Sequence, residues 1–343
     1  MLKFASFFLF LSIFSPALNA QLLEVEKKTI ALYKEVLPTV VNVSNIKVAR
    51  SFFNETVEVP QGAGSGFVWD TTGHIVTNFH VVNGGDDFVV TFHNDPTQYQ
   101  AVLVGSEAKK DLAVLKLKER PKTLNPIVLG SSKELQVGQM TLAIGSPFGL
   151  DHTLTTGIVS ALGRKIDGFG GVKIHDMIQT DAAINMGNSG GPLLDSSGKL
   201  IGVNTMIFST SGSSAGLGFA VPVDTVKMIV PQLIQHGKVI RPGLGIGVLP
   251  EGAKKRIGIK EGVVITFVDE DGPAGKAGLK GLAQDRRGRV IMGDVLVAID
   301  SKEVNSLDDI YHALEKYKIG DTVAVKYLRE GKKKEARIKL QAL

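Results

Sequence analysis

A short glycine-rich stretch around Ser189, running from Gly187 to Pro192, holds the residue types with the clearest chemical potential. A serine hydroxyl is a weak nucleophile, so it needs an adjacent base and hydrogen-bond donors for the oxyanion that it creates. Flanking glycines let the backbone turn so that two N–H groups reach one oxygen. We therefore interpret Ser189 as a nucleophile, with the N–H groups of Gly187 and Ser189 as oxyanion donors. In isolation such a cluster equally fits a turn between strands, so its partners decide the matter.

Among the seven histidines, His80 is best placed to act as the base. It follows a predicted apolar strand that would hold the imidazole rigidly, whereas His74 lies beside a turn and is interpreted as structural or exposed. The base in turn needs a carboxylate that orients it and stabilises its cation. Asp111 fits because it directly precedes the apolar run 112–115, where an unpaired buried charge would be costly. Asp181 is the alternative, since it lies near Ser189, but it fits a role in ordering the loop equally well.

The composition describes a globular, turn-rich protein of two or three domains. The chain has 343 residues, 43% of them hydrophobic, and 39 glycines, which favours folded domains rich in β structure. Cysteine is absent, which excludes disulfides, thiolate metal sites and cysteine nucleophiles. We expect no metal and no other cofactor.

The first twenty residues predict export. Lys3 precedes an apolar run over 4–14, and small residues follow up to Ala20, which is typical of a cleaved secretory signal peptide. An uncleaved membrane anchor is the alternative. We therefore expect a signal peptide over residues 1–20 and a periplasmic or otherwise exported protein.

Short β-branched runs separated by glycine-rich turns extend to Val221 and predict antiparallel barrels. A hairpin is expected over 64–77, and a helix over 22–37 precedes the barrels. The polar stretch 47–60 is expected to be a loop. Further strands are predicted at 40–43, 88–92, 101–104, 112–117, 140–144, 155–159 and 200–206. A helix over 223–236 closes this domain, so we place the first domain at 21–236 and the second at 237–343.

The sequence around His80, Asp111 and Ser189 resembles the HtrA/Deg family of chymotrypsin-like serine proteases. The similarity extends through the segments 142–149, 156–160 and 218–222. It implies that His80 is the general base, Asp111 its orienting carboxylate, and Ser189 the nucleophile. The fold implied is mainly β, with a chymotrypsin-like double antiparallel β-barrel protease domain followed by an α/β PDZ domain.

The resemblance also implies roles for two loops. The segment 204–214, which begins with Asn204, Thr205, Met206 and Ile207, is similar to the wall of the primary specificity pocket. Residues 164–172 resemble a loop that senses activation. Two positions differ from the common family pattern, because Met186 stands in place of a proline and Ser146 in place of an asparagine.

The second domain resembles a PDZ domain from its first turn onward. Gly243, Leu244, Gly245 and Ile246 are similar to a loop whose N–H groups cap the C-terminal carboxylate of a peptide, which then adds as a β-strand. Ile310 and Leu314, at i and i+4 on a predicted helix over 307–317, are expected to line the side-chain pocket or to belong to the core. Strands are predicted near 245–249, 263–268, 295–299, 322–327 and 336–340. Residues 280–291 resemble an insertion found in chloroplast-lumen Deg proteases.

The basic excess lies in this C-terminal part, which has 21 Lys and Arg against 15 Asp and Glu from Gly237 onward. Without a nucleic-acid motif or interleaved aromatics, these charges predict solvated surface and no nucleic-acid partner. The family implies unfolded protein substrates, peptides with apolar C-termini at the PDZ domain, and a homotrimer or a multiple of trimers. Phe52 and Phe53 are exposed-aromatic candidates for the trimer interface. We expect an exported, ATP-independent endopeptidase for misfolded proteins, the alternatives being a chaperone-like scaffold and a regulatory protease with one target.

Overall fold

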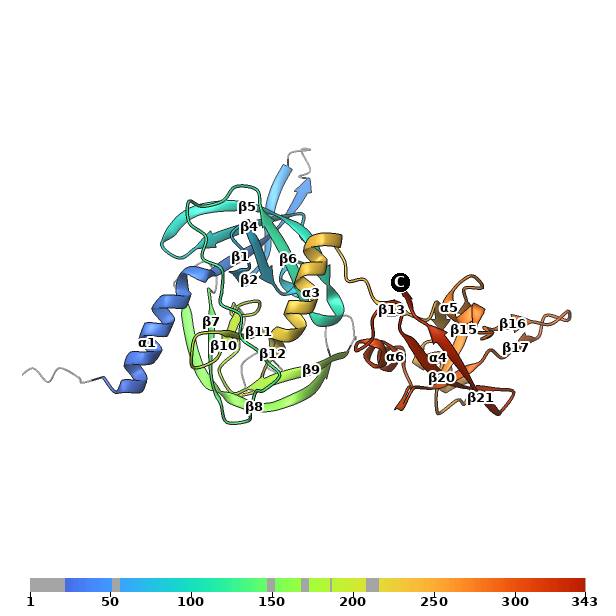
Figure 1. The fold of residues 1–343 in the computed structure, drawn as a ribbon. Coiled ribbons are helices and arrows are strands. Elements are labelled where there is room, and N and C mark those ends of the chain that lie inside the picture. Colours follow the sequence, from blue (N-terminus) through green and yellow to red (C-terminus); the bar gives the residue numbers. More distant parts are fainter. Residues whose placement is uncertain are drawn as a thin grey trace, which may run out of the picture.

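The computed structural model describes residues 22–50, 56–146, 152–167, 173–185, 187–207 and 216–342. The predicted signal peptide, the pair Phe52 and Phe53, and Met186 lie outside the described residues. So do 168–172 of the expected activation loop and 208–214 of the expected pocket wall. Figure 1 shows two barrels packed side by side, with the second domain joined to them by an extended segment.

The first closed barrel has the strand order β1-β2-β3-β6-β5-β4. Its strands are β1 (Val40–Arg50), β2 (Thr56–Val68), β3 (His74–Thr77), β4 (Asp87–Phe92), β5 (Asp95–Glu107) and β6 (Leu112–Leu117). Helix α1 (Glu24–Val36) and a 3₁₀ turn η1 (Leu37–Thr39) precede it, and the short α2 (Phe79–Val82) and η2 (Ala108–Lys110) lie between its strands. The predicted hairpin is present, since Phe67 of β2 pairs with Val76 of β3.

The second closed barrel has the order β10-β11-β12-β9-β8-β7. Its strands are β7 (Met140–Gly145), β8 (Thr153–Asp167), β9 (Lys173–Thr180), β10 (Pro192–Leu194), β11 (Leu200–Ile207) and β12 (Gly218–Pro222). All pairings within both barrels are antiparallel. The expected double antiparallel β-barrel, mainly β, is confirmed.

Strand β6 shows why the run after Asp111 is continuously apolar rather than alternating. Leu112 and Val114 point into the core shared with the second barrel, while Ala113 and Leu115 point into the interior of the first barrel. Because successive side chains of a strand face opposite sides, both faces of β6 are buried. The two cores therefore fix the strand that begins directly after Asp111.

The helix α3 (Val223–His236) has the predicted bounds and packs on that shared core. Its buried residues Val223, Val226, Val230 and Leu233 recur at helical spacing. The helix ends at Gly237, whose φ of 71° is the left-handed conformation that glycine adopts without strain. The link to the second domain begins there.

Residues 47–60 differ from the expected loop. Strands β1 and β2 stay paired from Ile46 and Pro60 out to Arg50 and Thr56. Backbone hydrogen bonds hold such an extension of a hairpin, and the polar residues scattered through this stretch obscure the strands in the sequence. The prediction was wrong for 47–50 and 56–60.

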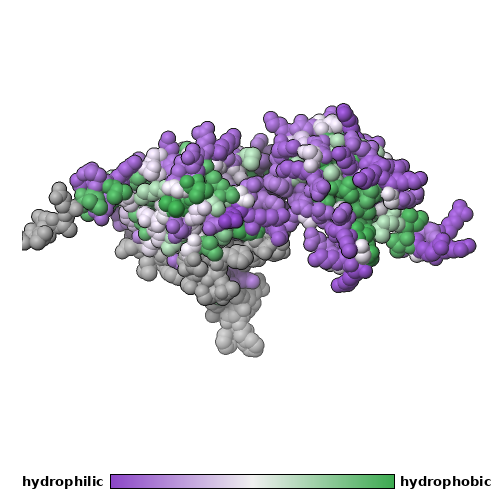
Figure 2. All heavy atoms as spheres, turned by 90° about the horizontal axis from the view of Figure 1, so that it is seen from below, coloured by the Kyte–Doolittle hydropathy of each residue, from purple (hydrophilic) through white to green (hydrophobic). Residues whose placement is uncertain are grey.

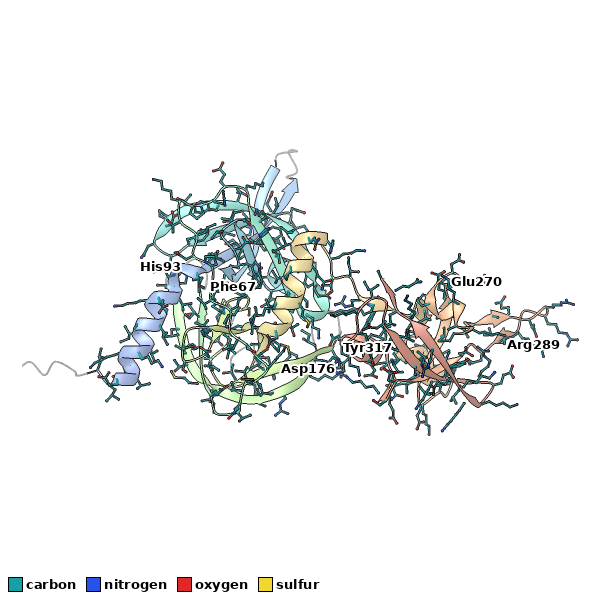
Figure 3. The ribbon with its side chains drawn as sticks, in the orientation of Figure 1. Phe67, His93, Asp176, Glu270, Arg289 and Tyr317 are labelled. Atoms are coloured by element: carbon teal, nitrogen blue, oxygen red, sulfur yellow. The ribbon has the colours of Figure 1, made fainter. Side chains whose placement is uncertain are left out.

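The second domain is a small sheet with the order β14-β15-β18-β20-β21 packed against helices. Its elements are β13 (Pro242–Gly243), β14 (Ile246–Val248), α4 (Glu251–Arg256), β15 (Val263–Val268), α5 (Pro273–Lys276), β16 (Ala283–Gln284), β17 (Val290–Ile291), β18 (Val295–Ile299), β19 (Lys302–Glu303), α6 (Leu307–Leu314), β20 (Thr322–Arg329), β21 (Lys332–Lys339) and β22 (Gln341–Ala342). The expected insertion forms the β16–β17 hairpin, which projects from the domain with Arg289 near its tip (Figure 3). Figure 2 shows that this tip is hydrophilic, in line with the expected solvated charges.

Candidate active site

The imidazole of His80 faces the carboxylate of Asp111. Its Nδ1 lies 2.8 Å from Asp111 Oδ2, and the backbone N–H of His80 donates to Asp111 Oδ1 at 3.0 Å. With an ionised carboxylate, Nδ1 is the donor, so Nε2 is left to accept a proton. His80 belongs to the short helix α2 rather than to the end of strand β3, and the first turn of this helix presents both its N–H and its ring to Asp111.

Asp111 is held in place from several sides. It is buried, and its φ of 52° lies in the left-handed region at the end of η2. Asn78 donates to its backbone carbonyl at 2.7 Å, and the Thr205 hydroxyl donates to Oδ2. A non-glycine residue adopts this conformation at a cost of about 1–2 kcal/mol, so the surrounding bonds maintain it. Asn78 follows β3 directly in the sequence, but nothing in the sequence marks it as a support for Asp111.

The hydroxyl of Ser189 donates to the backbone carbonyl of Thr205 at 2.9 Å. Among the described residues no hydrogen bond links Ser189 to His80, and the roles of these two residues as nucleophile and base stay a prediction. Among the residues that the structure describes, the N–H groups of Gly187 and Ser189 donate to no carbonyl. Gly187 has a φ of 108°, the backbone freedom that the glycine pattern predicts. Both N–H groups are therefore available to an oxygen.

Ser65, which the sequence reasoning missed, braces the loop that carries Ser189. Its N–H donates to the Ser189 carbonyl at 2.8 Å, and its hydroxyl donates to the Gly187 carbonyl at 2.5 Å. Ser65 is fully buried in β2. Gly190 fits against it closely, because a Cβ at Gly190 would lie 2.2 Å from the Ser65 carbonyl oxygen. The glycine at 190 is thus required by a close backbone approach rather than by a turn alone.

The four residues expected to wall the specificity pocket lie on β11, and two of them also contact Asp111 or the loop that carries Ser189. Thr205 contacts both Asp111 and Ser189, and Asn204 donates its side-chain N–H to the Pro192 carbonyl at 2.9 Å. Both are fully buried. Met206 and Ile207 complete the strand, and their role in the pocket stays a prediction.

The residues weighed against His80 and Asp111 lie elsewhere. Asp181 accepts a hydrogen bond from the N–H of Ile158 at 2.7 Å, which ties the chain before the Ser189 loop to β8. His74 pairs with Asp70 at 2.6 Å in the β2–β3 turn. Burial opposes the ionised form of Asp70, but bonds from Thr72 and His74 prevail and lower its pKa to about 2. His74 and Asp181, the two residues weighed as alternatives, therefore both have hydrogen-bond partners that give them a structural role.

The predicted carboxylate loop of the second domain precedes the edge strand β14. Gly245 has a φ of 69°, and among the described residues the N–H groups of Leu244 and Gly245 donate no hydrogen bond. Strand β14 pairs only with β15 in the described part of the sheet, so its other edge is open to an added strand. Ile310 and Leu314 are 4% and 3% exposed and pack in the domain core. Their contact with a peptide stays a prediction.

One group of metal-type ligands occurs among the described residues. Asp176 of β9 lies with His312 and Glu315 of the α6 region so that one ligand atom of each is within 4.8 Å of the others. The Glu315 carboxylate already pairs with Lys110 Nζ at 2.7 Å. Lysines also surround the group, which disfavours a dication, so we assign no metal to it.

Comparison with known proteins agrees with this geometry. A family model described as "Trypsin-like peptidase domain" matches residues 64–203, and one described as "PDZ domain" matches residues 242–340. The fold and these matches define a trypsin-like serine endopeptidase with one PDZ domain.

Comparison with individual relatives narrows this class of serine endopeptidases to one family. The chain is 48% identical over 318 residues to "Protease Do-like 1, chloroplastic" of Arabidopsis thaliana, covering 92% of this chain and 72% of the relative. It is 40% identical to "Probable periplasmic serine endoprotease DegP-like" of Bartonella henselae, covering 83% of this chain and 54% of that protein. The solved structure "HtrA-type protease AlgW with decapeptide" matches with a TM-score of 0.68 and 33% identity, covering 91% of this chain and 98% of that one. The chain belongs to the HtrA family of serine proteases, in which it spans about half the length of the DegP-like relative.

Proposed function

We propose that this protein is an exported, ATP-independent endopeptidase that degrades misfolded or damaged proteins, with His80, Asp111 and Ser189 as its triad. The single observation that carries the catalytic part is the pair of bonds between His80 and Asp111. This pair orients the imidazole, and among the described residues the N–H groups of Gly187 and Ser189 donate to no carbonyl. A protein that only binds unfolded chains has no physical need for this arrangement.

The reaction begins when the Ser189 hydroxyl turns from the Thr205 carbonyl toward His80. Nε2 of His80 takes the hydroxyl proton as Oγ attacks the scissile carbonyl, and Asp111 stabilises the imidazolium. The oxyanion of the tetrahedral intermediate accepts bonds from the N–H groups of Gly187 and Ser189. His80 then gives its proton to the departing amine, and water releases the acyl group from Ser189 by the same steps.

Three further statements belong to this proposal. Export is supported by the signal-like first twenty residues and by the periplasmic name of the Bartonella relative, although the Arabidopsis relative is chloroplastic. Within the described residues no helix is long and apolar enough to cross a membrane. The PDZ domain binds peptides with apolar C-termini, as the open loop at Leu244 and Gly245 suggests. The working assembly is a trimer or a multiple of trimers.

The experiment that tests the proposal is degradation of an unfolded protein by the wild type and by Ser189→Ala. We expect the variant to lose at least about 10⁴ in kcat, because the nucleophile is gone. It should also lose labelling by a serine-directed phosphonate while its thermal unfolding is unchanged. Undiminished turnover by Ser189→Ala would disprove the assignment.

The same pair of proteins separates the alternatives. A chaperone-like scaffold would prevent aggregation of the unfolded protein equally well with and without Ser189, and with little cleavage by either. A regulatory protease would cleave one folded target and leave bulk unfolded protein intact. The similar solved structure of the HtrA-type protease AlgW contains a decapeptide.

A further inference from the structure

The short helix α2, which carries His80, is attached to strand β1 through one buried side chain. Nδ2 of Asn45 donates to the carbonyl of Val81 at 3.0 Å and to that of Asn83 at 3.2 Å. Carbonyls at the end of a helix have no partner within the helix, and Asn45 supplies a donor to two of them here. Asn45 is itself buried in the barrel. The end of the helix is therefore fixed to β1.

The loop that carries Ser189 is attached to the neighbouring strand β2. The N–H of Ser65 donates to the Ser189 carbonyl at 2.8 Å. Strands β1 and β2 are paired, with Asn42 opposite Ser65 and Val43 opposite Gly64. The proposed base and the proposed nucleophile are thus each held by one strand of the same pair. The pairing of β1 with β2 consequently helps to set the distance between them.

Gly64 of β2 lies against both attachments. A Cβ at this position would lie 2.6 Å from Cγ2 and 3.0 Å from Cγ1 of Val81, the residue after His80. It would also lie 3.0 Å from the carbonyl oxygen of Ser189. Carbon atoms in favourable contact are about 3.5–4.0 Å apart, so there is no room for a side chain at 64. The missing side chain lets α2 and the serine loop pack against the same backbone position.

The backbone conformation of Gly64 does not explain why this residue is glycine. Its φ lies outside the left-handed range that other residues avoid, so alanine fits the backbone. Val81 does not turn away from an added methyl group, because both of its own methyl groups face Gly64 and valine in a helix has one strongly preferred rotamer. The added group would instead move α2 or the serine loop by up to about 1 Å.

We propose that Gly64 is a positioning residue for catalysis, and that its missing side chain sets the spacing at which a proton passes from the Ser189 hydroxyl to the His80 imidazole. Gly64 has this role only if His80 and Ser189 are the base and the nucleophile, as proposed above. An added methyl group would separate the two. Because a misplacement of about 1 Å can cost about 10²-fold in rate, the chemical step would slow while substrate binding is unaffected.

The test compares Gly64→Ala with a matched control, Gly202→Ala, in the full chain. Gly202 is also a buried strand glycine with a φ outside the left-handed range. A Cβ there would lie 2.9 Å from the Val221 carbonyl oxygen, and its other near neighbours belong to Ala220 and Ile178. With a fluorogenic peptide as substrate, we expect Gly64→Ala to lower kcat about 10-fold to 100-fold with KM unchanged. Gly202→Ala should lose thermal stability but keep kcat within about twofold.

Removal of the Val81 methyl groups separates a displaced helix from a general loss of stability. Val81→Ala takes away both carbons that the added Cβ meets most closely. The kcat of the double variant Gly64→Ala/Val81→Ala should therefore return to within about threefold of that of Val81→Ala alone. The rate of labelling by a serine-directed phosphonate should fall in Gly64→Ala and recover in the double variant, since labelling needs the same base and nucleophile.

Two results would overturn the role of Gly64. One is an equal kcat for Gly64→Ala and Gly202→Ala, and the other is a double variant that stays more than about threefold slower than Val81→Ala. If Gly64→Ala alone does not fold, the comparison of the double variant with Val81→Ala decides in the same way. Turnover by Ser189→Ala at the wild-type rate would instead overturn the proposed function, and the role of Gly64 with it.

Discussion

Replacement of Thr205 by valine tests how far the triad depends on the bonds around Asp111. The Thr205 hydroxyl donates to the same Oδ2 atom that faces His80 Nδ1. Valine keeps the shape and the strand preference of threonine and leaves the backbone carbonyl that accepts from Ser189. The substitution therefore removes one hydrogen bond from a buried carboxylate and little else.

The magnitude follows from that bond. A hydrogen bond to a charged group contributes about 1.5–3 kcal/mol, and each 1.36 kcal/mol corresponds to about tenfold in rate. If the whole bond supports the transition state, kcat falls about 10-fold to 150-fold. KM should stay unchanged, because Thr205 would act through Asp111 and His80 rather than on the bound peptide.

The assay is steady-state hydrolysis of a fluorogenic peptide, with Thr141→Val as the matched control. Thr141 is also fully buried in a strand, but its hydroxyl bonds to the Thr180 hydroxyl at 2.9 Å rather than to the triad. Both variants should show similar small losses of thermal stability. Equal kcat values for Thr205→Val and Thr141→Val would refute the reasoning.

Three other predictions concern the junction, the assembly and the PDZ loop. His175 of β9 stacks on His312 of α6, with ring centroids 4.5 Å apart. Burial, with the charges of Lys165, His312 and Lys110 prevailing over Glu315, lowers the pKa of His175 below its ordinary 6.5. Because the His312 ring belongs to the PDZ domain and covers His175, protonation of His175 should oppose the contact between the two domains, which should weaken as pH falls below about 6.5. Limited proteolysis within 237–242 should accelerate between pH 7.5 and 5 in the wild type but not in His175→Phe, and pH-independent cleavage in the wild type would contradict this. Light scattering should give the mass of a trimer or its multiple, and a monomer at micromolar concentration would exclude that assembly. A peptide with an apolar C-terminus should bind with micromolar affinity, about 8 kcal/mol, as its free acid, and equal affinity of its C-terminal amide would show that the loop is only a turn.

The sequence predicts most strands of the barrels because burial on two faces leaves a pattern. The run from Leu112 to Leu117 has the bounds of β6, and the helix over 223–236 has those of α3. The prediction from sequence fails where polar residues interrupt the apolar pattern, as in the β1–β2 extension to Arg50 and Thr56. The sequence pattern also does not predict short strands such as β10, because Pro192–Leu194 is a strand only through its pairing with β7 and β11.

Within the candidate site, the residues that carry chemistry are easier to predict than those that hold them. Few residue types can fill the roles proposed for Ser189, His80 and Asp111, so their types and flanking residues point to these roles. Ser65 and Asn78 act through ordinary hydrogen bonds to backbone carbonyls, which many serines and asparagines make. Their support for the site depends on which strands meet, and that is a property of the closed barrels rather than of any local pattern.

The contact between Lys110 and Glu315 shows the same limit across domains. In the sequence, Lys109 and Lys110 are two charges before an apolar strand, a pattern typical of a solvated turn. Lys110 is nevertheless buried, because α6 of the second domain covers it and supplies the opposite charge. The Glu315 carboxylate pairs with Lys110 Nζ at 2.7 Å, so the burial of this lysine depends on a residue of the other domain that no local pattern around Lys110 reveals.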